Sequence, residues 1–170
     1  MADGFYLSPE VRADKAALLE HLVDPEIAHN TLRLPFPYTA QHADEWLSLR
    51  EKEACDPEKL FGIREPNGYL VGAIGLGGTL PPGPDEAEFG YWMAKPCRNR
   101  GLMTRAIVAY TEHAFARLGF KRLIACPFPW NIASQRALEK AGYRRECLLS
   151  QHVVKNGVTL DAILYARERG

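Results

Sequence analysis

One segment, from Glu86 to Cys126, constrains the fold of this chain more than any other. An apolar run with the two-residue period of a strand, Glu86 to Met93, stops just before Pro96. A helical pattern then runs from Arg105 to Leu118, and Arg122 to Cys126 is apolar enough for a buried strand. Because a strand, a helix and a strand in succession form a parallel crossover, this segment predicts a βαβ unit.

Hairpin signals lie on both sides of this unit. Pro66-Asn67-Gly68 and Lys155-Asn156-Gly157 each separate two apolar runs, which is typical of a β-hairpin. The runs are Leu60–Glu65, Tyr69–Gly75, Cys147–Val154 and Val158–Tyr165. Since hairpin strands are antiparallel and the crossover is parallel, the sequence predicts a mixed sheet.

Apolar residues recur at helical spacing in three other segments, and Asp24-Pro25 starts a short fourth one. These segments are Ala13–Val23, Thr39–Cys55, Asn131–Ala141 and Asp24–Thr31. Phe5 to Leu7 is a first short strand, and no linker or repeat divides the chain. We expect a single α/β domain over residues 1–170, with a mixed central sheet of about seven strands and about four helices.

Composition excludes several classes of protein. Apolar residues make up 46% and charged residues 25% of the chain, with a formal net charge of zero, so there is no electrostatic case for binding nucleic acid or a membrane. The four cysteines lie far apart without a metal-binding spacing, so no metal is expected. The start has no secretory signal, and a cytoplasmic protein with reduced thiols is expected.

The turn between the Glu86–Met93 strand and the following helix carries basic residues and a glycine. Free backbone N–H groups and the positive end of the helix dipole meet there, so the turn is suited to phosphate. Seven residues are expected to contribute: Arg98, Asn99, Arg100, Gly101, Leu102, Met103 and Thr104. On its spacing alone, the same turn could be a plain exposed connection with solvated arginines.

Three motifs together resemble the GNAT superfamily of N-acetyltransferases, closest to its RimJ/RimL-like branch. They are Glu88-Phe89-Gly90-Tyr91-Trp92, Arg98-x-x-Gly101, and the run Asn131 to Tyr143, which is the most specific of them. The resemblance spans nearly the whole chain and implies the GNAT fold, with the sheet splayed between its fourth and fifth strands. Met103 departs from the small residue that the family's phosphate motif usually has at its last position.

The resemblance implies acetyl-CoA as co-substrate and assigns it further residues. The backbone of Trp92, Met93 and Ala94 would bind the pantetheine amides, and Asn131 would contact the pantetheine. Ser134 would lie beside the thioester sulfur. Because the tyrosine that many members use as general acid is replaced here by Leu138, either Ser134 is the acid or there is no dedicated one. Asn131 is also a good helix N-cap, and Ser134 could equally be a plain surface residue.

Glu88 is the leading catalytic candidate. An ammonium group must lose a proton before it attacks a thioester, and a carboxylate on a central strand can accept that proton directly or through water. Strand alternation places Glu88 on the face opposite Phe89, and several GNAT enzymes have their general base at this position. The alternative is a carboxylate that is solvated or paired with an arginine.

The acceptor site is less defined. Phe36, Tyr38 and His152 lie in segments that resemble the acceptor-binding regions of the family, although the two aromatic residues could equally cap the core. We expect an N-acetyltransferase that moves acetyl from acetyl-CoA to a primary amine by direct attack in a ternary complex. A peptide or protein N-terminal amine is favoured; a small-molecule amine and a non-catalytic acyl-CoA-binding module are the alternatives. Both a monomer and a homodimer remain open.

Overall fold

The computed structural model describes residues 4–52, 58–80 and 83–170. Its strands form a seven-stranded sheet in the order β1-β2-β3-β4-β5-β7-β6. The strands are β1 (Tyr6–Ser8), β2 (Leu60–Arg64), β3 (Leu70–Leu76), β4 (Glu86–Met93), β5 (Arg122–Ala125), β6 (Arg144–Lys155) and β7 (Val158–Glu168). Because β4 pairs with β5 in parallel and β5 with β7 antiparallel, the sheet is mixed, which confirms the predicted fold class.

Helices join these strands in the predicted order. They are α1 (Lys15–His21), α2 (Pro25–Asn30), α3 (Ala40–Lys52), α4 (Leu102–Ala116) and α5 (Ile132–Lys140), with 3-10 turns at Arg12–Asp14 and Lys95–Cys97. No helix within the described ranges is long and apolar enough to span a membrane. In those same ranges, no three or more histidine, cysteine, aspartate or glutamate residues are grouped so that they could hold a metal ion.

Several element boundaries differ from the sequence prediction by one to three residues. α4 begins at Leu102 rather than Arg105, so the residues expected to bind phosphate include its first turn. β6 begins at Arg144 rather than Cys147, because Arg144 and Arg145 pair with β7 although their side chains are charged and exposed. The predicted end of the third helix, Cys55, lies outside the described residues, and α3 is described to Lys52.

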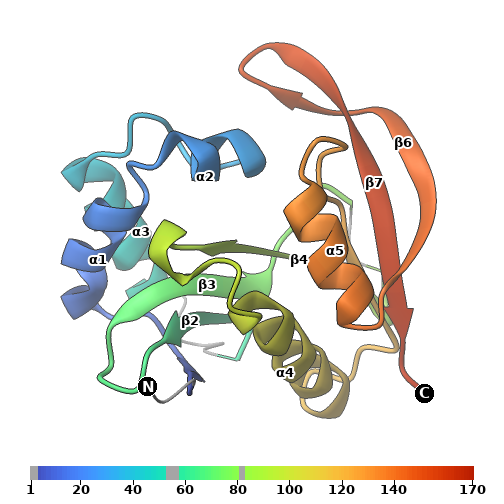
Figure 1. Ribbon diagram of the computed structural model, residues 1–170, viewed down its shortest axis with the longest axis horizontal. Helices are drawn as coiled ribbons and strands as arrows, with labels where there is room; N and C mark the ends of the chain where they lie inside the picture. The colour runs from blue at the N-terminus through green and yellow to red at the C-terminus, as the bar shows by residue number, and fades with distance from the viewer. Residues whose placement is uncertain (1–3, 53–57, 81–82) are drawn as a thin grey trace. The chain divides into compact units, whose positions relative to one another are not determined.

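The chain forms two compact units, Met1–Ile74 with Tyr91–Leu102, and Gly75–Gly90 with Met103–Gly170. In the first unit, α1, α2 and α3 gather beside β2 and β3 (Figure 1). Their apolar faces form one cluster, in which Leu18, Leu47 and Leu70 are each 1% exposed. α3 contributes Ala43 and Leu47, which lie one helical turn apart on its buried face.

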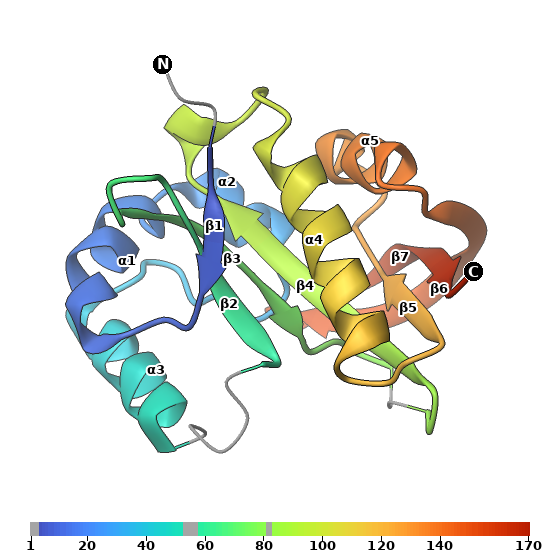
Figure 2. The same cartoon turned by 90° about the horizontal axis from the view of Figure 1, so that it is seen from below.

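In the second unit, α4 lies across β4 and β5 (Figure 2). Phe89 of β4 is 2% exposed, and its ring packs against the rings of Tyr110 and Tyr143, with centroids 5.8 and 5.5 Å apart. Glu88 is half-buried and Gly90 is exposed, so the predicted alternation of β4 is confirmed. Pairing between β4 and β5 ends at Glu88 and Ile124, as expected of strands that splay beyond this point.

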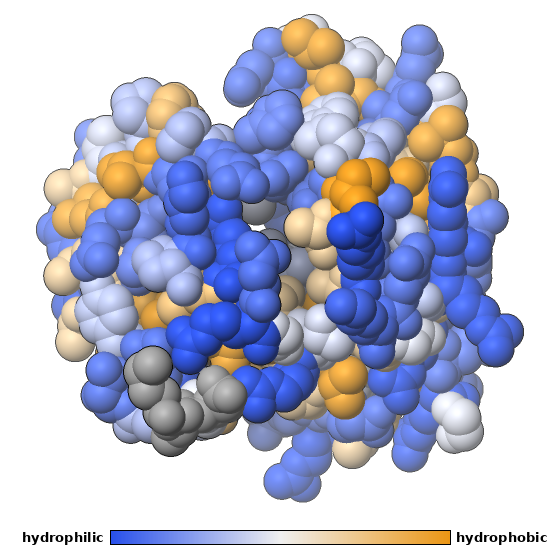
Figure 3. Space-filling model, in the orientation of Figure 1, coloured by the Kyte–Doolittle hydropathy of each residue, from blue (hydrophilic) through white to orange (hydrophobic). Residues whose placement is uncertain are grey.

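The hairpin β6–β7 belongs to the second unit and carries an irregularity. Its register shifts between Leu149 and Val153, and Gln151 there has φ 50°, in the left-handed region. The Gln151 N–H donates to Asp161 Oδ1 at 2.8 Å, which holds the bulge in place. Figure 3 shows apolar residues near the end of this hairpin, where Val154 and Val158 are 66% and 58% exposed.

Candidate functional site

The loop that follows β4 has the backbone shape expected of an anion-binding turn. Asn99 and Gly101 have φ of 61° and 71°, and both residues are exposed. No atom lies within 4 Å of the position that a Cβ of Gly101 would occupy, so the backbone is open to a ligand. α4, which has no acidic residue in its first turn, begins at the next position. These features fit a pyrophosphate bound by backbone N–H groups.

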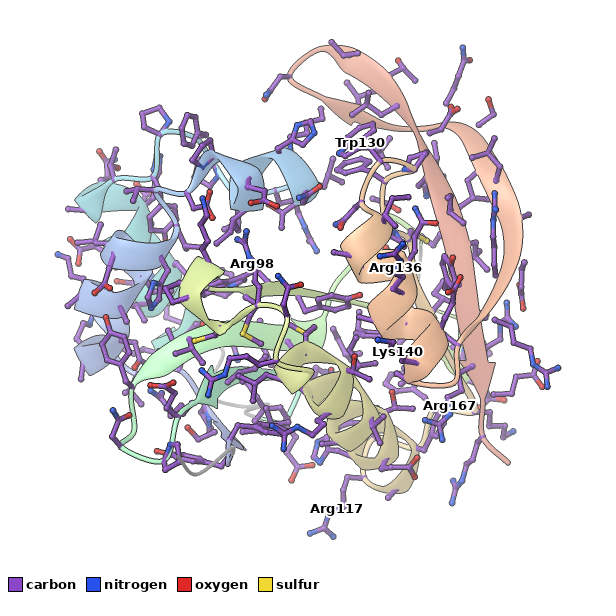
Figure 4. All side chains as sticks on the ribbon, in the orientation of Figure 1. Arg98, Arg117, Trp130, Arg136, Lys140 and Arg167 are labelled. Atoms are coloured by element: carbon purple, nitrogen blue, oxygen red, sulfur yellow. The ribbon has the colours of Figure 1, made fainter. Side chains whose placement is uncertain are left out.

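The side chain of Arg98, in contrast, is already bonded within the first unit. Its Nη2 donates to Asp24 Oδ2 at 2.9 Å, its Nη1 to Glu26 Oε2 at 2.7 Å and its Nε to the Met93 carbonyl at 3.1 Å. Figure 4 labels Arg98 on the loop below α2, the helix that carries both acidic partners. The expectation that Arg98 offers its charge to phosphate therefore conflicts with its observed partners.

Arg100 is the more open of the two arginines. It forms an ion pair with Glu65 at 3.7 Å, and its side chain is 41% exposed, against 23% for Arg98. Of the two arginines, Arg100 is therefore the one whose side chain is more accessible to an anion from solvent.

The end of β4 offers fewer free backbone groups than the sequence predicts. The Ala94 N–H donates to the Val71 carbonyl at 2.7 Å, and the Ala94 carbonyl accepts from the Cys97 N–H at 3.0 Å. Met93 O receives the Arg98 Nε–H bond. Of the three residues predicted to bind pantetheine, Ala94 thus has an N–H that is already engaged. The prediction that the backbone of this segment binds pantetheine therefore depends more on Trp92 and Met93.

Glu88 is held by the loop that precedes its own strand. Its Oε2 accepts N–H bonds from Thr79 at 2.6 Å and Leu80 at 3.0 Å, and the Thr79 hydroxyl lies at 3.3 Å. A Cβ on Gly78 would overlap the Glu88 carboxyl group, so the loop can wrap this closely only because position 78 is glycine. The carboxylate is therefore fixed in orientation while remaining half-buried.

His152 joins this arrangement through Thr79. Its Nε2 lies 2.7 Å from Thr79 Oγ1, which makes a line of contacts from Glu88 through Thr79 to His152. The structure thus connects a predicted base with a predicted acceptor residue from β6. The sequence analysis did not predict a contact of Thr79 or Gly78 with Glu88; the glycine pair Gly77-Gly78 was the local signal that a backbone approaches something closely.

Cys126 lies beside Glu88 but does not have the properties of a nucleophile. Burial raises the pKa of its thiol, and the charge of Glu88 and a hydrogen bond with it raise this pKa further. The thiolate, which is the reactive form, is therefore disfavoured at neutral pH.

The α5 residues lie at the start of their helix as predicted. Asn131 Oδ1 accepts the Ser134 N–H at 3.1 Å, so Asn131 is the N-cap of α5. Ser134 is half-buried in the first turn. Tyr143 is 3% exposed, its hydroxyl lies 2.7 Å from Thr111 Oγ1, and burial raises its pKa, so it belongs to the core rather than to a proton-donating site.

The two aromatic residues proposed for the acceptor site differ in exposure. Phe36 is 56% exposed, whereas Tyr38 is 6% exposed and packs in the core of the first unit. Burial raises the pKa of Tyr38 to about 12, with a smaller effect from the charge of Glu10. The structure thus places Tyr38 in the core, and only Phe36 remains open to a ligand.

Residues 5–144 match the family described as "Acetyltransferase (GNAT) domain". "Probable N-acetyltransferase YjcK" of Bacillus subtilis (strain 168) is 33% identical over 113 residues, which are 66% of this chain and 62% of that relative. The chain therefore spans less than two thirds of that relative's length.

Two solved structures share the fold. "Mycobacterium smegmatis RimJ in complex with CoA-disulfide" has a TM-score of 0.80 at 23% identity, covering 96% of this chain and 81% of that one. RimL, described as "Ribosomal L7/L12 alpha-N-protein acetyltransferase in complex with Coenzyme A", has a TM-score of 0.80 at 18% identity, with 98% and 95% covered. At these identities, the similarity extends to the fold alone.

Proposed function

Because this chain belongs to the acetyltransferase (GNAT) family, we propose that it transfers an acetyl group from acetyl-CoA to a primary amine by direct attack in a ternary complex. The favoured acceptor is the N-terminal amine of a peptide or protein, in line with the structural neighbour RimL, an alpha-N-protein acetyltransferase. A small-molecule amine is the second candidate. The proposal treats residues 1–170 as one acetyltransferase domain.

The observation that carries the proposal is the fixed carboxylate of Glu88. A general base is effective when its accepting oxygen is held in one place and lies within reach of the proton that it removes. Oε2 of Glu88 is bound by two N–H groups of the Thr79–Leu80 backbone, which hold the carboxylate in one orientation. We assign to Glu88 the removal of the proton from the attacking amine.

The remaining roles are those that membership of the GNAT family implies for these positions. Acetyl-CoA supplies an activated acyl group on a thiolate leaving group. The N–H groups of Asn99 to Thr104 bind its pyrophosphate, and Arg100 adds positive charge. Trp92 and Met93 hold the pantetheine by their backbone, Asn131 contacts it, and Ser134 donates a proton towards the departing sulfur.

The test is turnover by the Glu88→Gln variant, followed by thiol release from acetyl-CoA with a panel of amines and N-terminal peptides. Glutamine keeps the size of the side chain but cannot accept the proton, so we expect kcat to fall by roughly 10²–10⁴-fold with little change in CoA affinity. Glu86→Gln is the matched control, because Glu86 lies two residues earlier on β4 and pairs with Arg122.

Two outcomes would contradict the proposal. Full activity of Glu88→Gln across the pH range would exclude Glu88 as the base. Tight CoA binding by the wild-type protein without turnover of any amine in the panel would favour an acyl-CoA-binding module instead.

A further inference from the structure

The contacts of Arg98 in the first unit point to a role other than phosphate binding. Both acidic partners lie at the start of α2, Glu26 in its first turn and Asp24 as its N-cap, 72 and 74 positions earlier in the chain, and no motif around Arg98 contains them. The Arg98 and Asp24 side chains are 23% and 15% exposed, so their bond is partly shielded from water. Charge-assisted bonds in such surroundings are stronger than the ion pairs of an open surface.

The local charge opposes a phosphate at the Arg98 guanidinium. One positive charge on Arg98 faces two negative charges, on Asp24 and Glu26, so the group carries a net charge of minus one. A phosphate that bound the guanidinium would have to displace at least one carboxylate or lie beside it, and both cost free energy. The side chain of Arg98 is therefore poorly placed to be an anion ligand.

The same three bonds are well placed to fix the loop. Arg98 Nε–H bonds the Met93 carbonyl at the end of β4, and Nη1 and Nη2 bond the first turn of α2. Asp24 Oδ1 accepts the Glu26 N–H at 3.0 Å while its Oδ2 accepts from Arg98, so one carboxylate both caps α2 and holds the arginine. The backbone at Arg98 is thus tied at two places before it turns through Asn99 and Gly101.

We propose that Arg98 is a positioning residue: its guanidinium ties the phosphate-binding loop to Asp24 and Glu26 of α2, and the backbone N–H groups of the loop bind the CoA pyrophosphate. The inference rests on the proposed function only in that CoA is the ligand. It assigns Asp24 and Glu26 an indirect role in CoA binding, and it removes the Arg98 side chain from direct contact with the ligand.

Asp24→Asn distinguishes a positioning role of Arg98 from a phosphate-binding role, because the two roles predict opposite changes in CoA affinity. Asparagine keeps the cap of α2, since it is as good an N-cap as aspartate, but it loses the charge that holds Arg98. If Arg98 positions the loop, CoA affinity measured by calorimetry should fall roughly 3- to 30-fold. If Arg98 were itself the phosphate ligand, freeing it from Asp24 should tighten CoA binding.

Arg98→Lys gives a second test in which the charge is conserved. Lysine binds phosphate well as a point charge, but it cannot make three bonds in the geometry of the guanidinium. We expect Arg98→Lys to lose as much CoA affinity as Arg98→Gln does. Combining either substitution with Asp24→Asn should lower the CoA affinity little further. KM for acetyl-CoA should rise while kcat at saturation stays near the wild-type value, which a general loss of folded protein would not produce.

Arg117→Gln is the matched control for charge removal, because Arg117 is exposed and Figure 4 shows its side chain pointing away from the end of α4. Its CoA affinity should equal that of the wild type. Tighter or unchanged binding by Asp24→Asn, or near wild-type affinity of Arg98→Lys, would overturn the proposal. Wild-type protein that fails to bind CoA at all would instead contradict the proposed function.

Discussion

Arg64 and Asp14 form a two-point ion pair in the first unit, with Nη1–Oδ1 and Nη2–Oδ2 distances of 2.6 and 2.7 Å, and each side chain is 7% exposed. The guanidinium also donates to Ser8 Oγ and to the carbonyls of Pro9 and Gly68. These bonds join β1, the Arg12–Asp14 turn and the β2–β3 hairpin.

Arg64→Ala should lower the free energy of unfolding by about 3–5 kcal/mol, because it leaves the Asp14 carboxylate buried without its counter-charge. Urea denaturation followed by circular dichroism measures this loss. Arg12→Ala is the control: Arg12 pairs with Glu51 at the surface, where both side chains are about half exposed, and its loss should lower the free energy of unfolding much less than Arg64→Ala does. Equal effects of the two variants would contradict the assigned role of burial.

Glu10 makes stability depend on pH. It is 7% exposed, its Oε2 accepts the Trp46 Nε1–H bond at 2.8 Å, and its Oε1 is buried without a hydrogen-bond partner in the described structure. Burial raises the pKa of Glu10, with the Trp46 bond acting in the opposite direction. The folded state therefore holds this proton more tightly than the unfolded state does.

The stabilisation due to Glu10 is therefore fully present below the ordinary pKa of glutamate and is lost as pH rises through the raised value. Glu10→Gln stays neutral throughout, so its Tm should fall less than that of the wild type as pH rises from 4 towards 8. Thermal unfolding of both proteins at matched ionic strength measures the difference. Parallel Tm curves would show that Glu10 does not carry this pH dependence.

Gly78→Ala should abolish most turnover while the protein stays folded. The added methyl group overlaps the Glu88 carboxyl and forces either the loop or the carboxylate to move. Since a displacement of about 1 Å at a reacting group can cost on the order of 10²-fold, we expect kcat to fall by that amount with CoA affinity unchanged. Gly83→Ala, whose Cβ would lie 3.6 Å from its nearest neighbour, should keep full activity. Equal kcat in the two variants would contradict the role of the loop.

Gly101→Glu should prevent CoA binding. It places a negative charge at the proposed phosphate site and a side chain at φ 71°, where it is strained by about 1 kcal/mol. Gly101→Ala keeps the strain without the charge, and Gly157→Glu keeps both at an exposed turn with φ 77°. Calorimetry with CoA should find weak binding in Gly101→Glu alone. Unchanged affinity of that variant would exclude the loop as the phosphate site.

Local patterns in the sequence predicted the elements that depend on neighbouring residues. β4 has the predicted bounds, since its alternation and Pro96 define the strand and its end. Asn131 caps α5 as predicted, and Gly142 follows that helix with φ 88°, in the left-handed region where glycine commonly ends a helix. Each of these features is decided by residues within about four positions of one another, which is the range over which helix caps and strand periods act.

The partners of the site residues could not be predicted in this way. His152 contacts Thr79, which lies 73 positions away in the sequence. The neighbouring Gln151 has a left-handed conformation within a bulge, and no glycine or asparagine at that position indicates it in the sequence. The sequence predicts only that Asp24 starts a short helix, yet its carboxylate also accepts a hydrogen bond from Arg98. A charge pattern shows which residues can pair, whereas the fold decides which of them meet.

The long separation between Arg98 and α2 also bears on the order of folding. A helix such as α4 forms from local contacts in microseconds or less, whereas a contact across 74 residues must first overcome the entropy of closing that loop. The phosphate-binding loop would therefore take its final shape only when the first unit is complete. During refolding, CoA binding should lag behind the recovery of the helical circular dichroism signal. CoA would then bind only to fully folded molecules and not to those in which only the helix has formed.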